Sequence, residues 1–256
     1  MAEKICVMSP KGGVGKTTLA LNLGLHLAEN HGKKTIVLDS NTHAANLSFY
    51  LGLPNLPITL NDVIKWNLPV EKAIYAYSRN FHFVPATIRF EKKIDLVNTR
   101  HFKEIIDKVS PYYDYIIFDS PPGVGKDVKT LISQSDRTIM ITTPDLPTVA
   151  TCLKGSFLVK KQQKPLSVVV NKSLGYKYEL SVEEIAEMLE PDEIHVIPFD
   201  FKAKEAVAKR EPLFHNRKSK VTKKIEQIAR SLVQEVEQEI EAEKSLLSKI
   251  LSFFKR

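Results

Sequence analysis

Seven short apolar runs rich in β-branched residues recur along the 256-residue chain, separated by stretches with helical periodicity. Runs such as YIIF and SVVV do not alternate polar with apolar residues, which is typical of strands covered by helices on both faces. The alternation of such strands with helices predicts a doubly wound α/β fold with a mostly parallel sheet. The predicted strands are Lys4–Met8, Thr35–Leu38, Phe81–Pro85, Tyr113–Phe118, Thr138–Thr142, Ser167–Val170 and His195–Ile197. The predicted helices are Thr17–Glu29, Leu60–Ile64, His101–Lys108, Val182–Leu189 and Thr222–Val236.

The segment SPKGGVGKTT, residues 9–18, lies between the first predicted strand and the first predicted helix. Its glycines let backbone N–H groups face an anion, and the helix that follows adds its positive end. It matches the phosphate-loop pattern except that Pro10 replaces the first glycine, so it predicts a nucleotide site. Lys16 is expected to contact the β- and γ-phosphates, and Thr17 to ligate Mg²⁺. The residues predicted to surround the phosphates are Lys11, Gly12, Gly13, Val14, Gly15, Lys16, Thr17 and Thr18.

Two aspartates end predicted strands. Asp119 closes YDYIIFD and Asp39 closes TIVLD. A phosphate site needs a carboxylate at a neighbouring strand end to hold Mg²⁺ or its water ligands, so both are candidate metal ligands. Either aspartate could alternatively be a turn residue at the end of its strand. A second glycine-rich stretch, Gly123–Lys126, is followed by an aspartate rather than a hydroxyl residue and is predicted to be a loop.

The last twelve residues, 245–256, form an amphipathic pattern when placed on a helix. Six large apolar side chains fall within an arc of roughly 160°, and serine, lysine and arginine occupy the opposite side. Such a helix rises only about 18 Å, too short to cross a hydrocarbon core of about 30 Å, but it suits the membrane interface. Packing on the domain and docking in a protein groove are the alternatives. The predicted lipid-facing residues are Leu246, Leu247, Ile250, Leu251, Phe253 and Phe254.

The formal net charge of +7 comes from one stretch, because residues 202–224 hold nine Lys/Arg and two Glu. This excess fits DNA, anionic lipid headgroups or a solvated face. The N-terminus lacks the pattern of a secretory signal, and no apolar window of about 18 residues occurs. Two widely separated cysteines, Cys6 and Cys152, are expected to be buried reduced thiols. These features predict a cytoplasmic protein.

Four motifs are similar to those of the MinD/ParA family of deviant Walker A ATPases, its MinD-like members most of all: KGGVGKTT, VLDSNTHAANLS, DYIIFDSPPGVG and VVVNK. The resemblance implies a phosphate-loop NTPase fold of the SIMIBI type, ATP and Mg²⁺ as ligands, and an ATP-bound homodimer with the nucleotides at its interface. Lys11 would then reach the phosphates of the partner's ATP. Asp119 would be the carboxylate linked to Mg²⁺, and residues 120–125 the second switch loop. The resemblance also assigns the adenine side to Asn171, Pro198, Phe199 and Asp200.

One position departs from the family pattern. Asn41 stands where the family usually has a second aspartate, which supports the water that attacks ATP. An amide can orient a water but cannot accept its proton, so slow hydrolysis is expected. His43 lies two residues on and is a second candidate for this role. Lys11, Lys16 and Asn41 are thus the residues expected to act in catalysis.

These inferences predict an ATPase domain over residues 1–236, an acidic helical linker over 237–244 and a membrane-targeting helix over 245–256. The predicted function is an ATP-dependent switch that dimerises, associates peripherally with the cytoplasmic face of a membrane and positions a partner. A ParA-like protein that binds DNA without sequence preference is the first alternative. A nucleotide-dependent scaffold that hydrolyses ATP very slowly is the second. The cargo and the activating protein are left open.

Overall fold

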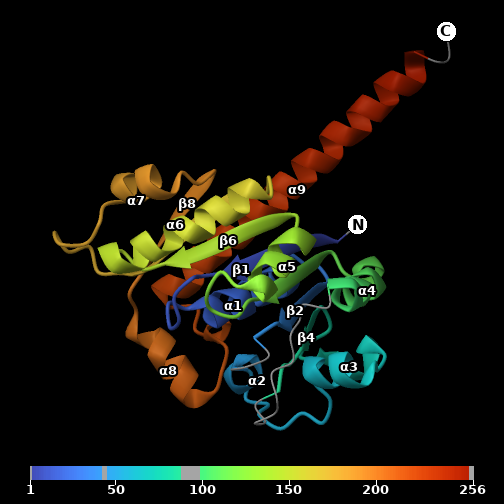
Figure 1. Ribbon diagram of the computed structural model, residues 1–256, viewed down its shortest axis with the longest axis horizontal. Coiled ribbons are helices and arrows are strands. Elements are labelled where there is room, and N and C mark those ends of the chain that lie inside the picture. Colours follow the sequence, from blue (N-terminus) through green and yellow to red (C-terminus); the bar gives the residue numbers. More distant parts are fainter. Residues whose placement is uncertain (1, 42–44, 88–98, 254–256) are drawn as a thin grey trace.

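The computed structural model of the protein describes residues 2–41, 45–87 and 99–253. Within these residues the core is an eight-stranded sheet with the order β3-β4-β2-β5-β1-β6-β7-β8 (Figure 1). The pair β3–β4 is antiparallel and the other described pairs are parallel. The strands are β1 (Glu3–Met8), β2 (Thr35–Asp39), β3 (Tyr75–Ala76), β4 (Phe81–Val84), β5 (Tyr115–Asp119), β6 (Arg137–Thr142), β7 (Leu166–Ser173) and β8 (Glu193–Pro198).

Helices cover both faces of this sheet. Two apolar clusters fill the space between the layers, and successive residues of one strand enter opposite clusters. Ile5 and Val7 pack with α1 and α9, whereas Cys6 and Met8 pack with α4 to α7. This alternation follows from the two-residue repeat of a strand and confirms the predicted doubly wound α/β fold. The α-helices are α1 (Lys16–Glu29), α2 (Leu47–Tyr50), α3 (Leu60–Trp66), α4 (Thr99–Val109), α5 (Lys126–Gln134), α6 (Leu146–Lys161), α7 (Val182–Leu189), α8 (Phe201–Lys209) and α9 (Lys220–Phe253).

Helix α1 lies directly against the sheet. A Cβ atom added at Gly24 would stand 2.7 Å from the Phe81 ring and 2.9 Å from a methyl of Val37. The glycine therefore lets the helix approach the strands more closely than any other residue would allow. Because α1 follows the phosphate loop immediately, this close packing fixes the position of that loop relative to the carboxyl edge of the sheet.

All seven predicted strands are present, and the short β3 was not predicted. Four helices, α2, α5, α6 and α8, were also missed. In α6 the buried residues include Thr148, Gly155 and Ser156, whereas Leu153 and Phe157 are exposed. Val149, Cys152 and Val159 share the buried face, so apolar side chains lie on both sides of the helix and no clear apolar periodicity marks it. The prediction for Gly123–Lys126 was partly wrong, because Lys126 already forms the first turn of α5.

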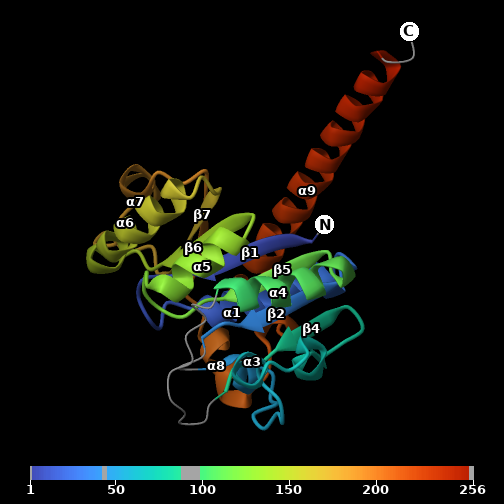
Figure 2. The ribbon, with the colours of Figure 1, turned by 45° about the vertical axis from the view of Figure 1, so that its right-hand side comes forward.

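Helix α9 is 34 residues long, which corresponds to about 50 Å. Its first half packs against α1 and β8, and its second half projects beyond the body of the molecule in both views (Figures 1 and 2). The helix runs through 237–244 without interruption, so the acidic stretch belongs to the same helix as the segments on either side. The division of residues 237–256 into linker and targeting helix stays a prediction, and Phe254 lies outside the described residues.

Near the point where α9 leaves the body of the molecule, two ion pairs join the helix to Arg137 of β6 and to Lys33, which lies just before β2. Arg137, at the start of β6, pairs with Glu3 and Glu235, and Lys33 Nζ lies 2.9 Å from Glu237 Oε1. The guanidinium is largely buried, whereas the Lys33–Glu237 pair is more open to solvent. Of the helices that the structure describes, none combines the length and the apolar character needed to span a bilayer.

Candidate nucleotide site

The phosphate loop connects the end of β1 to the start of α1. Gly13 and Gly15 adopt left-handed backbone conformations, with φ of 76° and 111°, and Gly15 is the N-cap of α1. These conformations turn successive peptide N–H groups toward one side, which makes the concave anion site expected of such a loop. Lys16 in the first turn of α1 is buried. Burial lowers the pKa of its ammonium, and the nearby Asp119 carboxylate opposes that shift.

Asp39 and Asp119 meet at the carboxyl edge of the sheet, beside this loop. Both side chains are buried, and Asp39 accepts hydrogen bonds from the backbone N–H groups of Asn41, Asn46 and Leu47. Burial raises the pKa of both carboxyl groups, and in Asp39 the charge of Asp119 raises it further. Two buried carboxylates without a cation between them are therefore electrostatically unfavourable.

One oxygen of this pair is available to bind a hard cation. Asp119 Oδ1 is buried and has no hydrogen-bond partner among the described residues, and the Thr17 hydroxyl is hydrogen-bonded to the same side chain. In the described parts of the chain, no three His, Cys, Asp or Glu side chains form a metal cluster. A cation here would complete its shell with the Thr17 hydroxyl, phosphate oxygens and water, which is how Mg²⁺ is usually bound at phosphate sites.

A cavity of about 620 Å³ opens beside the phosphate loop and the carboxylates. This volume lies in the usual range for small-molecule sites, about 300–1,000 Å³. Predicted residues from four separate segments line it: Gly12, Gly13, Gly15, Lys16, Thr17, Thr18, Asn41, Asn171, Pro198, Phe199 and Asp200. The lining residues that were not predicted include Asn46, Tyr50, Lys172, Lys204 and Val221. Lys204 lies in the basic stretch 202–224, which its charge marked as a surface for DNA or lipid and not as part of a nucleotide site.

The side of the cavity away from the carboxylates is formed by β7, β8 and α8. Lys204 Nζ lies 5.6 Å from the centroid of the Phe199 ring, which makes a cation–π contact. Asp200 uses its carboxylate within the protein, where it accepts from the N–H groups of Lys202 and Lys220 and from the Ser219 hydroxyl. It therefore joins the start of α8 to the start of α9, and because these bonds occupy its oxygens, Asp200 has a structural role at this wall.

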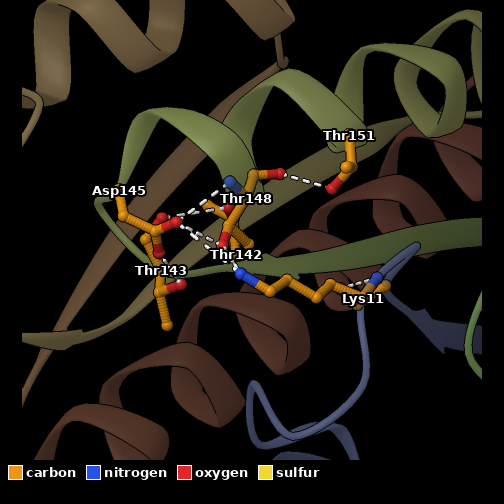
Figure 3. Close-up of polar contacts among 7 residues, drawn as sticks. Lys11, Thr142, Thr143, Asp145, Thr148 and Thr151 are labelled. Carbon is orange, nitrogen blue, oxygen red and sulfur yellow. Dashed lines mark hydrogen bonds and ion pairs between the residues drawn. The ribbon is translucent and has the colours of Figure 1, made fainter.

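Lys11 extends toward the N-terminus of α6 (Figure 3) and is not among the residues that line the cavity. Its Nζ donates a hydrogen bond of 2.7 Å to Thr148 Oγ1 and lies 3.7 Å from Asp145 Oδ1. Asp145 is the N-cap of α6 and also accepts from the Thr148 N–H at 3.0 Å. In this conformation the lysine contacts its own subunit, and about half of its side chain is exposed.

Comparison with known proteins places this site in a family. A family model described as an AAA domain matches residues 2–174. Septum site-determining protein MinD of a Synechocystis strain is 31% identical over 229 residues, which cover 86% of this chain and 85% of that protein. The chain belongs to the MinD/ParA family of ATPases. Two solved MinD structures agree. MinD of Pyrococcus horikoshii complexed with Mg-ADP has a TM-score of 0.82 at 26% identity, covering 91% of this chain and 96% of that one. The MinC:MinD complex of Aquifex aeolicus has a TM-score of 0.78 at 30% identity, covering 91% and 96%.

As a MinD/ParA ATPase, this chain binds ATP, and its phosphate loop, buried lysine and paired carboxylates are arranged to hold a charged phosphate chain. Asn41 lies on the cavity wall and is half-buried, with its N–H directed at Asp39 Oδ1 at 3.1 Å. It therefore stands within the cavity wall, and its role toward the attacking water stays a prediction. His43 lies outside the described residues.

Asn171 makes a contact with the phosphate loop that a side chain binding only the base would not need. Its Nδ2 donates a hydrogen bond of 2.7 Å to the carbonyl of Val14. A Cβ added at Gly15 would lie 2.4 Å from the same nitrogen, so only glycine fits beneath it. Asn171 thus contacts the phosphate loop of this MinD/ParA ATPase as well as lining the cavity, and its role toward adenine stays a prediction.

Proposed function

We propose that this ATPase is a switch of the MinD type, which binds Mg-ATP, pairs with a second copy across the nucleotides and then attaches to the cytoplasmic face of a membrane. The course of α9 carries the proposal. Its first turn lines the nucleotide cavity through Val221, and the same unbroken helix leads to the projecting segment at the other end (Figure 1). A single helix therefore runs from the nucleotide cavity to residues 245–253.

Mg²⁺ would be held by Asp119, Thr17 and Asp39, directly or through water. The unpartnered Asp119 oxygen and the raised carboxyl pKa values support this assignment, because a divalent cation would relieve the repulsion between the two carboxylates. The ion would neutralise charge on the phosphates. Lys16 lies in the loop that would bind them and adds a second, fixed positive charge. The complex of Pyrococcus horikoshii MinD with Mg-ADP supports magnesium and an adenine nucleotide as the ligands of this site.

Lys11 is proposed to act across the dimer. In the structure it is hydrogen-bonded to Thr148 and ion-paired with Asp145, so it must leave α6 to reach a partner's ATP. The cost of leaving is small, since a half-exposed ion pair contributes at most about 1 kcal/mol. Two ATP molecules brought together in a dimer carry a large negative charge, and a lysine supplied in trans offsets it. ATP would thereby favour the dimer over the monomer.

Hydrolysis is proposed to be slow because Asn41 can orient a water and cannot take its proton. The ATP-bound dimer would then persist until another protein completes the site. Single-turnover hydrolysis by the wild type and by Asn41→Asp tests this point, and the variant should be faster. Equal rates would show that Asn41 does not limit the reaction. The complex of Aquifex aeolicus MinD with MinC supports a protein partner for the dimer.

Membrane attachment is tested by cosedimentation of the full chain with vesicles that contain anionic phospholipid, with ATP and with ADP. One short amphipathic helix binds weakly, but two on one dimer act as linked ligands, so pelleting should depend on ATP. A truncation ending at Glu243 should remain in solution. Pelleting that is equal with ATP and ADP would rule out gating by dimerisation.

Two point variants make this experiment sharper. Ile250→Glu places a charge on the predicted apolar face, whereas Ser248→Glu places the same charge on the predicted polar face. Only the first should abolish pelleting, because a buried charge costs more than the rest of a short helix contributes. If both variants lose binding equally, the effect is one of net charge.

DNA binding by residues 202–224 is the second candidate. Part of this basic stretch is engaged within the protein: Lys202 Nζ donates to the Lys218 carbonyl, Lys209 pairs with Glu205, and Lys204 stands over Phe199. These contacts reduce the charge available to phosphates. A DNA arm of the cosedimentation experiment distinguishes the two functions. Binding to DNA with ATP, together with no binding to vesicles, would favour the ParA-like alternative.

A further inference from the structure

We infer that Lys172 is a positioning residue for the phosphate loop. Lys172 follows Asn171 at the end of β7, and its Nζ donates a hydrogen bond of 2.7 Å to the carbonyl of Gly13. Asn171 donates a bond of the same length to the next carbonyl, that of Val14. Two consecutive side chains of one strand therefore hold two consecutive peptides of the loop, across 157 and 159 residues of sequence.

The backbone of β7 is distorted at Asn171 and Lys172, and this distortion lets both side chains reach the loop. Successive side chains of a regular strand point to opposite faces of the sheet and could not both reach one loop. Between Val170 and Ser173, β7 has one residue more than β8, which advances only from Val196 to Pro198. Within this bulge Lys172 has φ of 62°, in the left-handed region that non-glycine residues rarely adopt. Such a conformation is unfavourable and is typical of functional sites.

The geometry of the peptide bond explains what the two contacts do. A trans peptide is planar, so its C=O and N–H groups point in opposite directions. Holding the carbonyl of Gly13 toward Lys172 turns the N–H of Val14 away from β7, and holding the carbonyl of Val14 toward Asn171 does the same for the N–H of Gly15. These are two of the loop N–H groups that face a bound phosphate in sites of this kind. The clamp thus orients the loop before the nucleotide arrives.

This inference rests on ATP binding and is independent of dimerisation and membrane attachment. Lys172 also adds a positive charge at the cavity, so a test must separate orientation from charge. Lys172→Met removes the ammonium and keeps most of the side-chain stem, and Lys172→Arg keeps a donor. Lys177→Met is the matched control, because Lys177 is an exposed lysine in the following loop.

The first measurement is the affinity of the full chain for ATP and for inorganic tripolyphosphate, which has no base or ribose. Lys172→Met should weaken both by roughly the same factor, about tenfold, as expected for loss of one hydrogen bond made by a charged group. Lys172→Arg should recover most of this loss, and Lys177→Met should show none. If only ATP binding weakens, Lys172 contacts the base or ribose, and the inference is overturned.

The second measurement is hydrogen exchange at the amides of Val14 and Gly15 in the nucleotide-free protein. Lys172→Met should speed exchange at these two amides and leave the melting temperature unchanged. Unchanged exchange with weakened phosphate binding would mean that the lysine acts through charge alone and positions nothing. A general fall in stability, with faster exchange throughout β7, would assign Lys172 a merely structural role.

Discussion

Asp39 and Asp119 are register partners on the neighbouring parallel strands β2 and β5, so their carboxyl groups lie side by side at the edge of the sheet. Both are buried, and among the described residues no ion pair joins either carboxylate to a basic side chain; Lys16 is the cation whose charge acts on Asp119. Such a pair is unfavourable in the empty protein and favourable around a divalent cation. Stability and activity therefore make opposite demands on the same two residues.

Asp119→Asn should separate these demands. Removing one of two like charges should leave the nucleotide-free protein at least as stable as the wild type in thermal unfolding. ATP hydrolysis should fall by about a hundredfold or more, because charge stabilisation by a bound metal is worth several kcal/mol. Magnesium should also cease to improve ATP affinity in calorimetry. A variant that unfolds at a lower temperature would contradict the assignment, since the aspartate would then be a structural residue.

Asp145→Asn should strengthen the ATP-dependent dimer. Asparagine is as good an N-cap as aspartate, so α6 should keep its first turn, while the attraction for Lys11 is lost. The two charged side chains are each about half exposed, so the gain should not exceed about fivefold in the dimer dissociation constant. Sedimentation velocity with ATP measures it. A weaker dimer would show that Asp145 itself contacts the second copy.

His26 should make stability fall in mild acid. Burial lowers the pKa of this histidine from 6.5 to about 4, with His31 lowering it further and Glu226 opposing. The unfolded chain therefore takes up a proton that the folded protein does not. The stability due to neutral His26 is full above about pH 6.5 and is lost as pH falls toward 4, by about 3 kcal/mol at most.

The matching experiment is denaturant unfolding from pH 7 to pH 5 of the wild type and His26→Gln. The difference between their unfolding free energies isolates His26, because the carboxyl groups of Asp39 and Asp119 change stability in the opposite direction in both proteins. The ring also packs edge-on against Phe214, with centroids 4.8 Å apart, so the substitution should lower stability at pH 7. A difference that does not change with pH would refute the prediction.

Arg137→Met should loosen α9 where it leaves the body. The guanidinium pairs with Glu3 and Glu235, and its loss leaves two carboxylates without their shared partner. We expect a loss of about 2 kcal/mol, below the range for fully buried pairs because the Glu235 side chain is 40% exposed. Hydrogen exchange should rise around residues 233–237. Lys33→Met removes the more exposed pair with Glu237 and should cost no more than about 1 kcal/mol.

Much of the fold follows from local pattern. Strand runs such as YIIF and SVVV predicted the parallel sheet, because burial on both faces demands continuous apolar sequence. The glycines of the phosphate loop act through their own backbone conformation, and Lys16 acts from the first turn of the helix that follows directly. Asp39 and Asp119 were each predicted as candidate metal ligands because each follows a buried strand run, and the structure places them side by side. Each of these inferences needs only a few neighbouring residues.

Other elements could not be inferred in this way. In α6 small, polar and apolar residues share the buried face while Leu153 and Phe157 are exposed, so its sequence shows no clear apolar face. The acidic stretch 237–244 was predicted to be a helical linker, and only the structure shows that it continues α9 without a break. Composition alone does not give the extent of either helix.

The sequence by itself thus determined the class of fold, the phosphate loop and the pair of carboxylates, because each depends on residues close in the chain or on a shared strand end. Only the tertiary structure decided that Lys11 contacts Thr148, 137 residues away, and that Asn171 and Lys172 hold the phosphate loop. Those contacts depend on which strands are neighbours, on a bulge in β7 and on side-chain direction. Packing of the whole chain sets all three.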